Sequence, residues 1–161
     1  MLDPLRDTLQ AIFGGSGVGF VPITSEVAGF RQTVIHTYDN FTTYSIVGDK
    51  SAEHPMGPAG HTFVPLAGNQ VHYSAIKRSR LNSFPVAYLY YGNTAGAKLL
   101  LNQGTGVDLP ATSGISKIKL GAALQSVTLQ VDGSTDLYGV SFEDTKGICV
   151  DNFSVRGNSG L

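Results

Sequence analysis

The feature of this chain that most constrains its fold is a series of short segments in which apolar and polar residues alternate. In the clearest one, residues 126–132, the apolar Val127, Leu129 and Val131 alternate with polar residues. A period of two places alternate side chains on opposite faces of an extended strand. Similar segments occupy 30–39, 41–47, 61–66, 70–78, 86–91, 98–102, 115–120, 137–142 and 148–155. The chain is therefore predicted to contain about ten short strands.

Turn-forming residues separate these segments, as antiparallel connections require. Residues 132–135 read Asp-Gly-Ser-Thr and stand between the segments 126–132 and 137–142. This pattern predicts a β-hairpin within residues 124–144. The stretch 48–60 contains several glycines and two prolines, which indicates an irregular loop.

Composition supports an all-β fold. Charged residues make up 14% of the chain, against roughly 25% in ordinary soluble domains, and 20 of the 161 residues are glycine. A length of 161 residues suits one domain with a sizeable core. We predict a jelly-roll-type β-sandwich with one short N-terminal helix.

The N-terminal helix is predicted over residues 3–13, where Leu5, Leu9 and Ile12 recur at helical spacing. Asp3 suits the N-cap and Pro4 the first helical position. The three apolar side chains are expected to be buried, because an apolar stripe is costly to leave in water.

The glycine-rich sequence GGSGVG follows this helix at residues 14–19. A phosphate-binding glycine loop lies between a strand and the N-terminus of a helix, whose free N–H groups hold the phosphate. Here the order is reversed, so we interpret the glycines as a helix C-cap and a connection.

Charge and cysteine usage exclude several classes of protein. The net charge is −1, which gives no basic surface for nucleic acid, and we interpret the cluster of Lys77, Arg78 and Arg80 as a solvated strand end. The single cysteine, Cys149, excludes an internal disulfide and is expected to be a buried, inert thiol. No run of apolar residues is long enough to span a membrane.

The histidines give weak signals for catalysis. A serine hydrolase needs a serine, a histidine base and usually a carboxylate that orients the base. His36 and His72 lie within predicted strands, and no catalytic serine motif accompanies them. We interpret both as structural histidines and keep a small serine esterase as an alternative.

Two metal sites are possible from residue types alone. His54 and His61 flank the sequence EHPMGPAGH together with Glu53, and these types can hold zinc. The spacing is weak evidence, so no metal is predicted there. Calcium could bind turn aspartates in a sandwich; the candidates are Asp132, Asp136 and Asp144. We interpret them as ordinary turn residues and predict no cofactor.

Aromatic residues give the strongest hint of a ligand. In PVAYLYYGN, residues 85–93, Tyr88 and Tyr90 share one face of a strand, and Tyr91 lies on the other. Tyrosine rings stack on the apolar faces of sugars, and nearby amides bind their hydroxyls. Tyr88, Tyr90, Tyr91 and Asn93 are therefore candidate sugar contacts. The alternative is that these tyrosines belong to the core.

Two stretches resemble a known family. LRDTLQAIFGGSGVGFVPIT, residues 5–24, resembles the segment that follows the nucleophile block in bacterial SGNH (GDSL-type) ester hydrolases, which include O-acetylpeptidoglycan esterases. GICVDNFSVRGNSGL, residues 147–161, resembles the segment that re-enters their catalytic domain. Between these segments the family carries an inserted β-sandwich similar to a carbohydrate-binding module.

The resemblance implies a division of the chain. Residues 1–18 would be a helix and linker from a hydrolase domain, 19–146 the sandwich, and 147–161 the last strand and the return segment. Gly157 would match a backbone donor of the oxyanion hole, active only in the complete hydrolase. The nucleophile block and the Asp-x-x-His block are absent from the sequence, so the chain alone is expected to be catalytically inactive.

The resemblance also implies a role. The chain would be a non-catalytic, carbohydrate-binding accessory domain of a periplasmic or extracellular bacterial esterase, placing polysaccharide or peptidoglycan near the catalytic SGNH domain. A purely structural insert that shapes the hydrolase cleft remains an alternative.

Overall fold

The computed structural model describes all residues except 1, 26–27, 29–30, 48–52, 77–82 and 152–161. The predicted basic cluster at 77–80 and Gly157 lie outside the described residues. The elements, in chain order, are α1 (Leu2–Phe13), β1 (Gly19–Pro22), β2 (Val34–Ser45), β3 (His61–Ala75), β4 (Phe84–Gly92), β5 (Ala97–Leu101), β6 (Val107–Leu109), β7 (Ser116–Leu124), β8 (Ser126–Asp132) and β9 (Asp136–Glu143). No helix in this described part of the chain is long and apolar enough to cross a membrane.

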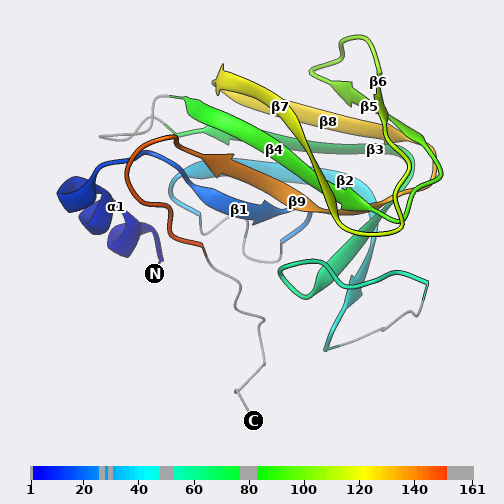
Figure 1. The fold of residues 1–161 in the computed structure, drawn as a ribbon, viewed down its shortest axis with the longest axis horizontal. Coiled ribbons are helices and arrows are strands. Elements are labelled where there is room, and N and C mark those ends of the chain that lie inside the picture. The colour runs from blue at the N-terminus through cyan, green and yellow to red at the C-terminus, as the bar shows by residue number, and fades with distance from the viewer. Residues whose placement is uncertain (1, 26–27, 29–30, 48–52, 77–82, 152–161) are drawn as a thin grey trace.

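The strands form two facing layers of antiparallel sheet (Figure 1). One layer contains β2, β3, β8, β5 and β6, and the other contains β1, β9, β4 and β7. The register connects the layers at a single residue pair, Phe63 of β3 and Leu137 of β9. The sheet is therefore nearly closed into a sandwich, which confirms the predicted fold class.

The order of pairing is that of a jelly roll. β1 pairs with β9, β3 with β8, β4 with β7, and β5 with β6, so each pair is nested inside the preceding one along the chain. Nested antiparallel pairs divided between two sheets define this topology. β2 is an additional edge strand beside β3.

The predicted hairpin between β8 and β9 is wrong. Both strands lie close to their predicted bounds, but β8 pairs with β3 and β5, whereas β9 pairs with β1, β4 and Phe63 of β3. The turn after Asp132 therefore carries the chain from one layer to the other. Gly133, at φ 105°, allows the chain to change direction sharply here. A glycine at such a φ suits a hairpin turn equally well.

Four predicted strands merge into two long ones. β2 continues through Asn40, whose φ is 59°, and its register with β3 shifts between Asp39 and Phe41. β3 likewise continues through Gly68 at φ 71°, where a turn was expected. A bulge kinks a strand without ending it, and this explains the error. Of the strand predicted at 148–155, residues 148–151 are irregular and the rest lies outside the described residues.

The core lies between the layers. On β8 the buried side chains are Val127, Leu129 and Val131, the alternation that the sequence predicts. On the inner face of the facing layer, the rings of Phe84 of β4 and Phe142 of β9 stack with centroids 3.9 Å apart. Burial of these large apolar side chains is the main stabilising contribution to the sandwich.

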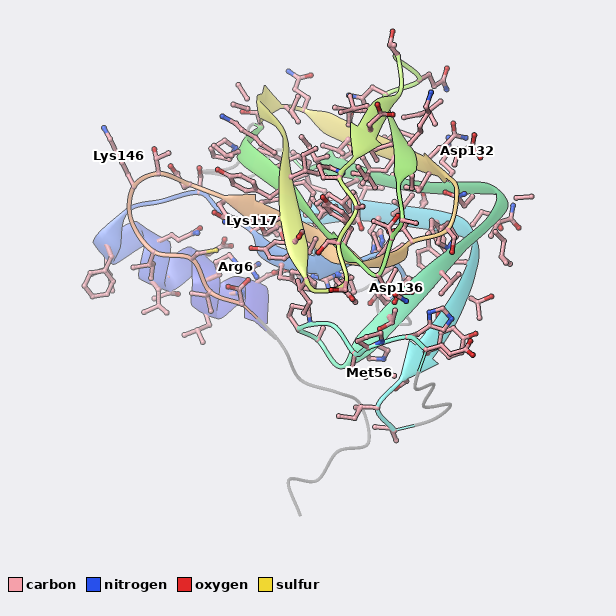
Figure 2. All side chains as sticks on the ribbon, turned by 45° about the vertical axis from the view of Figure 1, so that its right-hand side comes forward. Arg6, Met56, Lys117, Asp132, Asp136 and Lys146 are labelled. Carbon is pink, nitrogen blue, oxygen red and sulfur yellow. The ribbon has the colours of Figure 1, made fainter. Side chains whose placement is uncertain are left out.

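The helix α1 packs through its polar face, contrary to the sequence-based expectation. Leu5 and Ile12 are 51% and 68% exposed, whereas Arg6 and Gln10 are each only 3% exposed. Leu9 is partly buried. Arg6 donates hydrogen bonds to the carbonyl of Val150, so the helix is attached to the segment 144–151 (Figure 2). The apolar stripe therefore remains open to solvent.

Both ends of α1 have defined partners. Asp3, expected at the N-cap, lies inside the first turn, where it pairs with Arg6 and accepts a hydrogen bond from the Gln32 N–H at 2.7 Å. At the other end, Gly14 at φ 82° donates to the carbonyl of Gln10 at 2.9 Å. The first glycine of GGSGVG is thus the helix C-cap, as predicted.

Candidate functional site

Strand β4 places its tyrosines on two different faces. Ala87, Leu89 and Tyr91 point into the core and are at most 2% exposed. Tyr88 and Tyr90 alternate with them and are half-buried on the outer face of the β1-β9-β4-β7 layer. The ring of Tyr91 has no face free for a sugar, so we remove Tyr91 from the candidate contacts. Tyr88 and Tyr90 remain.

Tyr90 lies at a cleft of about 300 Å³ on this outer face. We call it the Tyr90 cleft. Its lining consists of Gly19, Phe20, Pro58, Tyr90, Ser141, Glu143, Asp144, Cys149 and Asp151. Strands β1, β4 and β9 contribute to it, together with Pro58 and the segment 144–151. Its size is near the lower end of the range for small-molecule sites, roughly 300 Å³.

Aromatic rings form the floor of the Tyr90 cleft. Phe20 of β1 and Tyr90 of β4 meet edge to face, with ring centroids 5.7 Å apart. Gly139 of β9 lies beneath Phe20, where a Cβ atom would come within 2.5 Å of the ring. The absence of a side chain at Gly139 therefore leaves room for the Phe20 ring beside Tyr90.

Carboxylates surround this floor. Ser141 donates to Glu143 Oε1 at 2.6 Å, and the Phe20 N–H donates to Asp151 Oδ1 at 2.5 Å. Glu143 uses its Oε1 atom for this bond, and Asp151 uses its Oδ1 atom. An aromatic floor bordered by carboxylate and hydroxyl groups provides stacking and hydrogen-bond acceptors for a hydroxylated ligand.

Asp144 serves mainly to fix the cleft's border. Its Oδ2 accepts hydrogen bonds from the N–H and hydroxyl of Ser16, at 2.9 and 2.8 Å. Burial tends to raise the pKa of Asp144, but the hydrogen bonds from Ser16 and from backbone N–H groups outweigh burial and lower it. The carboxylate is thereby kept ionised while it holds the connection after α1.

Cys149 is exposed, which corrects the prediction of a buried thiol. Local burial raises the pKa of the thiol, and the negative charges of Asp151 and Glu143 raise it further. A raised pKa keeps the sulfur protonated and weakly nucleophilic.

Tyr88 lies on the same face but does not line the Tyr90 cleft. The Lys117 ammonium of β7 lies over its ring, 4.6 Å from the centroid. This cation–π contact occupies one ring face. Tyr88 can therefore contribute to a ligand surface only beside the cleft.

Asn93 is not brought together with the tyrosines. Its side-chain NH₂ donates to the carbonyl of Glu53 at 2.7 Å and to Asp136 Oδ2 at 3.1 Å. It also lines a second cavity, about 630 Å³ and wide open, with Thr94, Thr112 and Ser134 among its neighbours. Its amide donors are already used within the protein.

Sequence reasoning missed a histidine–aspartate pair. His54 Nδ1 lies 2.6 Å from Asp136 Oδ1, although 82 residues separate them. Asp136 is 1% exposed, and the ring of His54 stacks on Tyr44 with centroids 4.6 Å apart. The sequence offered both residues as candidates, but for two different metals, and no local motif indicates that they meet.

The remaining histidines have structural partners. His36 Nε2 bonds the carbonyl of Ile23 at 2.9 Å, and His72 Nδ1 bonds the Thr128 hydroxyl at 2.8 Å. His61 Nδ1 bonds the carbonyl of Ala59 rather than joining His54. Among the residues that the structure describes, no three His, Cys, Asp or Glu side chains gather so as to hold a metal ion.

The surroundings of Asp136 also affect Tyr138. Burial and the nearby Asp136 carboxylate raise the pKa of Tyr138 to about 12. Gly57 packs against this ring so closely that a Cβ atom would lie 2.3 Å from Cδ1. We call residues 53–60 the strap, because they cross the outer face of β9 from His54 to Pro58.

The chain was compared with family models, curated proteins and solved structures. No family model matches the chain, and no curated protein matches its sequence. Its fold is similar to part of a solved structure of a peptidoglycan O-acetylesterase, with a TM-score of 0.71 and 20% identity. The match covers 94% of this chain and 41% of that one. The chain thus spans less than half of that enzyme's length, and the likeness establishes a shared fold.

Proposed function

We propose that this chain is a non-catalytic glycan-binding domain of an SGNH-type ester hydrolase that acts on peptidoglycan or another polysaccharide. The observation that carries the proposal is the Tyr90 cleft, where an outward tyrosine ring, Ser141 and the Glu143 carboxylate border one cavity. The likeness in fold to part of a peptidoglycan O-acetylesterase supports it. The periplasm or the cell exterior is the setting that suits such a substrate.

The mechanism is tethering. A sugar ring stacks its apolar C–H face on Tyr90, and its hydroxyls donate to Glu143 and Asp151. Tyr88 extends this contact along β4. A weak site of this kind raises the local concentration of polymer near a catalytic domain and needs no chemistry of its own.

The exposed side of α1 supports attachment to a second domain. Ile12 and Phe13 are 68% and 61% exposed at the end of α1, and Leu5, two turns earlier on the side of Ile12, is 51% exposed. Clustered apolar side chains of this kind mark interaction surfaces. We propose that the catalytic domain of the parent enzyme covers this stripe.

The test is retention on insoluble polymers. The purified chain is mixed with peptidoglycan sacculi, cellulose, chitin and xylan, and the bound fraction is measured over a range of polymer concentrations. We expect retention on peptidoglycan, and we expect Tyr90→Ala to weaken it about tenfold or more. Tyr88→Ala should have a smaller effect, because Lys117 already occupies one face of that ring.

Tyr38→Ala is the matched control. Tyr38 is an exposed tyrosine, 41% accessible, on β2 in the opposite layer. The Tyr38→Ala variant should bind the polymer as well as the unmodified chain does. Equal retention of the Tyr90 and Tyr38 variants would contradict the assigned contacts.

Failure to bind any polymer would favour the second candidate function, a structural insert that shapes the cleft of the hydrolase. The open apolar stripe on α1 is the observation that favours it. A third candidate, a small serine esterase, predicts a saturable rate with an aryl acetate that His36→Ala or His72→Ala abolishes. Both histidines bond non-carboxylate groups, which favours the binding function over catalysis.

A further inference from the structure

We infer that the His54–Asp136 pair is a latch that fixes one wall of the Tyr90 cleft. His54, Asp136 and Asn93 would then be positioning residues that set the affinity of the cleft without touching its ligand. This inference rests on the proposed function, because it requires a glycan in the cleft.

The fixed half of the latch is Asp136. Its side chain is 1% exposed, and both carboxylate oxygens have partners: Oδ1 binds His54 Nδ1 at 2.6 Å and Oδ2 accepts from Asn93 at 3.1 Å. A buried carboxylate is stable only while such partners are present. Through this contact the first residue of β9 holds the start of the strap.

Two further contacts hold the same end of the strap. Tyr44 of β2 stacks on the His54 ring at an interplanar angle of 26°. Asn93 donates to the carbonyl of Glu53 at 2.7 Å, so one amide binds both the strap and the latch carboxylate. This explains why Asn93, proposed from the sequence as a sugar contact, points toward the strap.

The strap transmits this anchoring to the cleft. Pro55 accepts a hydrogen bond from the Thr62 hydroxyl at 2.6 Å, and Gly57 packs on the ring of Tyr138. Pro58, four positions after His54, lines the cleft. Prolines restrict the backbone on this short path, so release of His54 should displace the wall rather than be absorbed in between.

The experiment uses the full chain and peptidoglycan as the probe. His54→Phe keeps an aromatic ring on Tyr44 and removes the bond to Asp136. Asp136→Asn is a second variant, which keeps the volume and removes the charge. His72→Phe is the matched control, because His72 bonds Thr128 in the opposite layer. Dissociation constants for sacculi are measured for each, and unfolding curves establish that each variant is folded.

Hydrogen exchange on the strap gives a readout that loss of global stability would not produce. The Gly57 and Gly60 N–H groups bond carbonyls within and next to the strap. We expect faster exchange at both amides in His54→Phe than in the unmodified chain, unchanged exchange in the β9 core, and affinity for sacculi about tenfold lower. Soluble peptidoglycan glycan strands should slow strap exchange in the unmodified chain, because coupling between two sites is reciprocal.

The outcomes separate the two proposals. If the unmodified chain binds sacculi and His54→Phe binds equally well with a loosened strap, the latch inference is wrong and the proposed function stands. If strap exchange is unchanged in both latch variants, the pair does not hold the strap and the inference is also wrong. If the unmodified chain binds no sacculi, the proposed function fails and the inference fails with it.

Discussion

The ring of Phe20 in β1 lies over Gly139 in β9, which is the register partner of Pro22 in the antiparallel β1–β9 pairing. A Cβ atom at position 139 would come within 2.5 Å of the Phe20 ring and 2.6 Å of the Val21 carbonyl oxygen. The ring can turn aside, but the carbonyl is part of the β1 backbone. The absence of a side chain at Gly139 thus permits both the position of β1 and the placement of the Phe20 ring in the floor of the Tyr90 cleft.

We expect Gly139→Ala to lower the free energy of unfolding by about 1–3 kcal/mol, the usual cost of overpacking a tight site. The variant should also weaken binding of peptidoglycan, because Phe20 must move from the floor of the cleft. Urea unfolding and sacculus retention measure the two effects.

Gly114→Ala is the control for this substitution. A Cβ atom at position 114 would meet no atom within 4 Å. The free energy of unfolding of Gly114→Ala should therefore differ from that of the unmodified chain by less than about 0.5 kcal/mol. Equal stability of the two alanine variants would contradict the close packing at Gly139.

The inverted packing of α1 predicts an unusual order of mutational effects. Gln10→Ala should lower the free energy of unfolding by about 1–2 kcal/mol, because Gln10 donates to the Gly17 carbonyl at 2.8 Å and to the Ile148 carbonyl at 3.2 Å. Ile12→Ala should change it by less than about 0.5 kcal/mol, because Ile12 is 68% exposed. Urea unfolding and hydrogen exchange of the helix amides test this order.

The reverse order, with Ile12→Ala the more damaging change, would show that the apolar stripe is buried in solution. Size measurement of the same samples would then distinguish burial within one molecule from burial between two molecules.

His36 predicts that the fold loses stability in acid. Burial lowers the pKa of His36 from 6.5 to about 4, against a weaker opposing effect of its bond to the Ile23 carbonyl. The folded state therefore binds this proton less readily than the unfolded state. The contribution of His36 is complete above about pH 6.5 and is lost as the pH falls toward 4, with a total on the order of 3 kcal/mol.

His36→Phe tests this assignment. The phenyl ring can keep the stack on Tyr73, where the centroids are 4.7 Å apart, and it does not titrate. The difference in unfolding free energy between the two proteins should shift in favour of the variant as the pH falls from 7 to 4. A difference independent of pH would contradict a buried neutral histidine.

The sequence predicted the strands better than their partners. The alternation of Val127, Leu129 and Val131 established β8 and its buried face, because a period of two is a local property. The predicted pairing of β8 with β9 was wrong, because the residues of the turn after Asp132 suit a hairpin and a change of layer equally. Pairing depends on contacts distant in sequence, such as Phe63 with Leu137, which no local pattern encodes.

The candidate site was predictable to the same partial extent. Alternation placed Tyr88 and Tyr90 on one face of the strand and Tyr91 on the other, but only the structure shows that the face with Tyr91 is the buried one. Pro58 and Asp151 both line the cleft although they lie far apart in the chain, and no local pattern indicates that they meet. The His54–Asp136 pair was hidden for the same reason.

The two flanks of the sandwich, α1 and the segment 144–151, are bound to each other, and this would restrict the movement of any domain joined to both of them. Arg6 and Gln10 of α1 donate hydrogen bonds to the carbonyls of Val150 and Ile148, so the helix and the segment 144–151 lie side by side at one end of the sandwich (Figure 1). A partner joined through a single flexible linker can swivel about it. A partner joined to both flanks would be held at two neighbouring points. The Tyr90 cleft would then keep a fixed orientation relative to that partner.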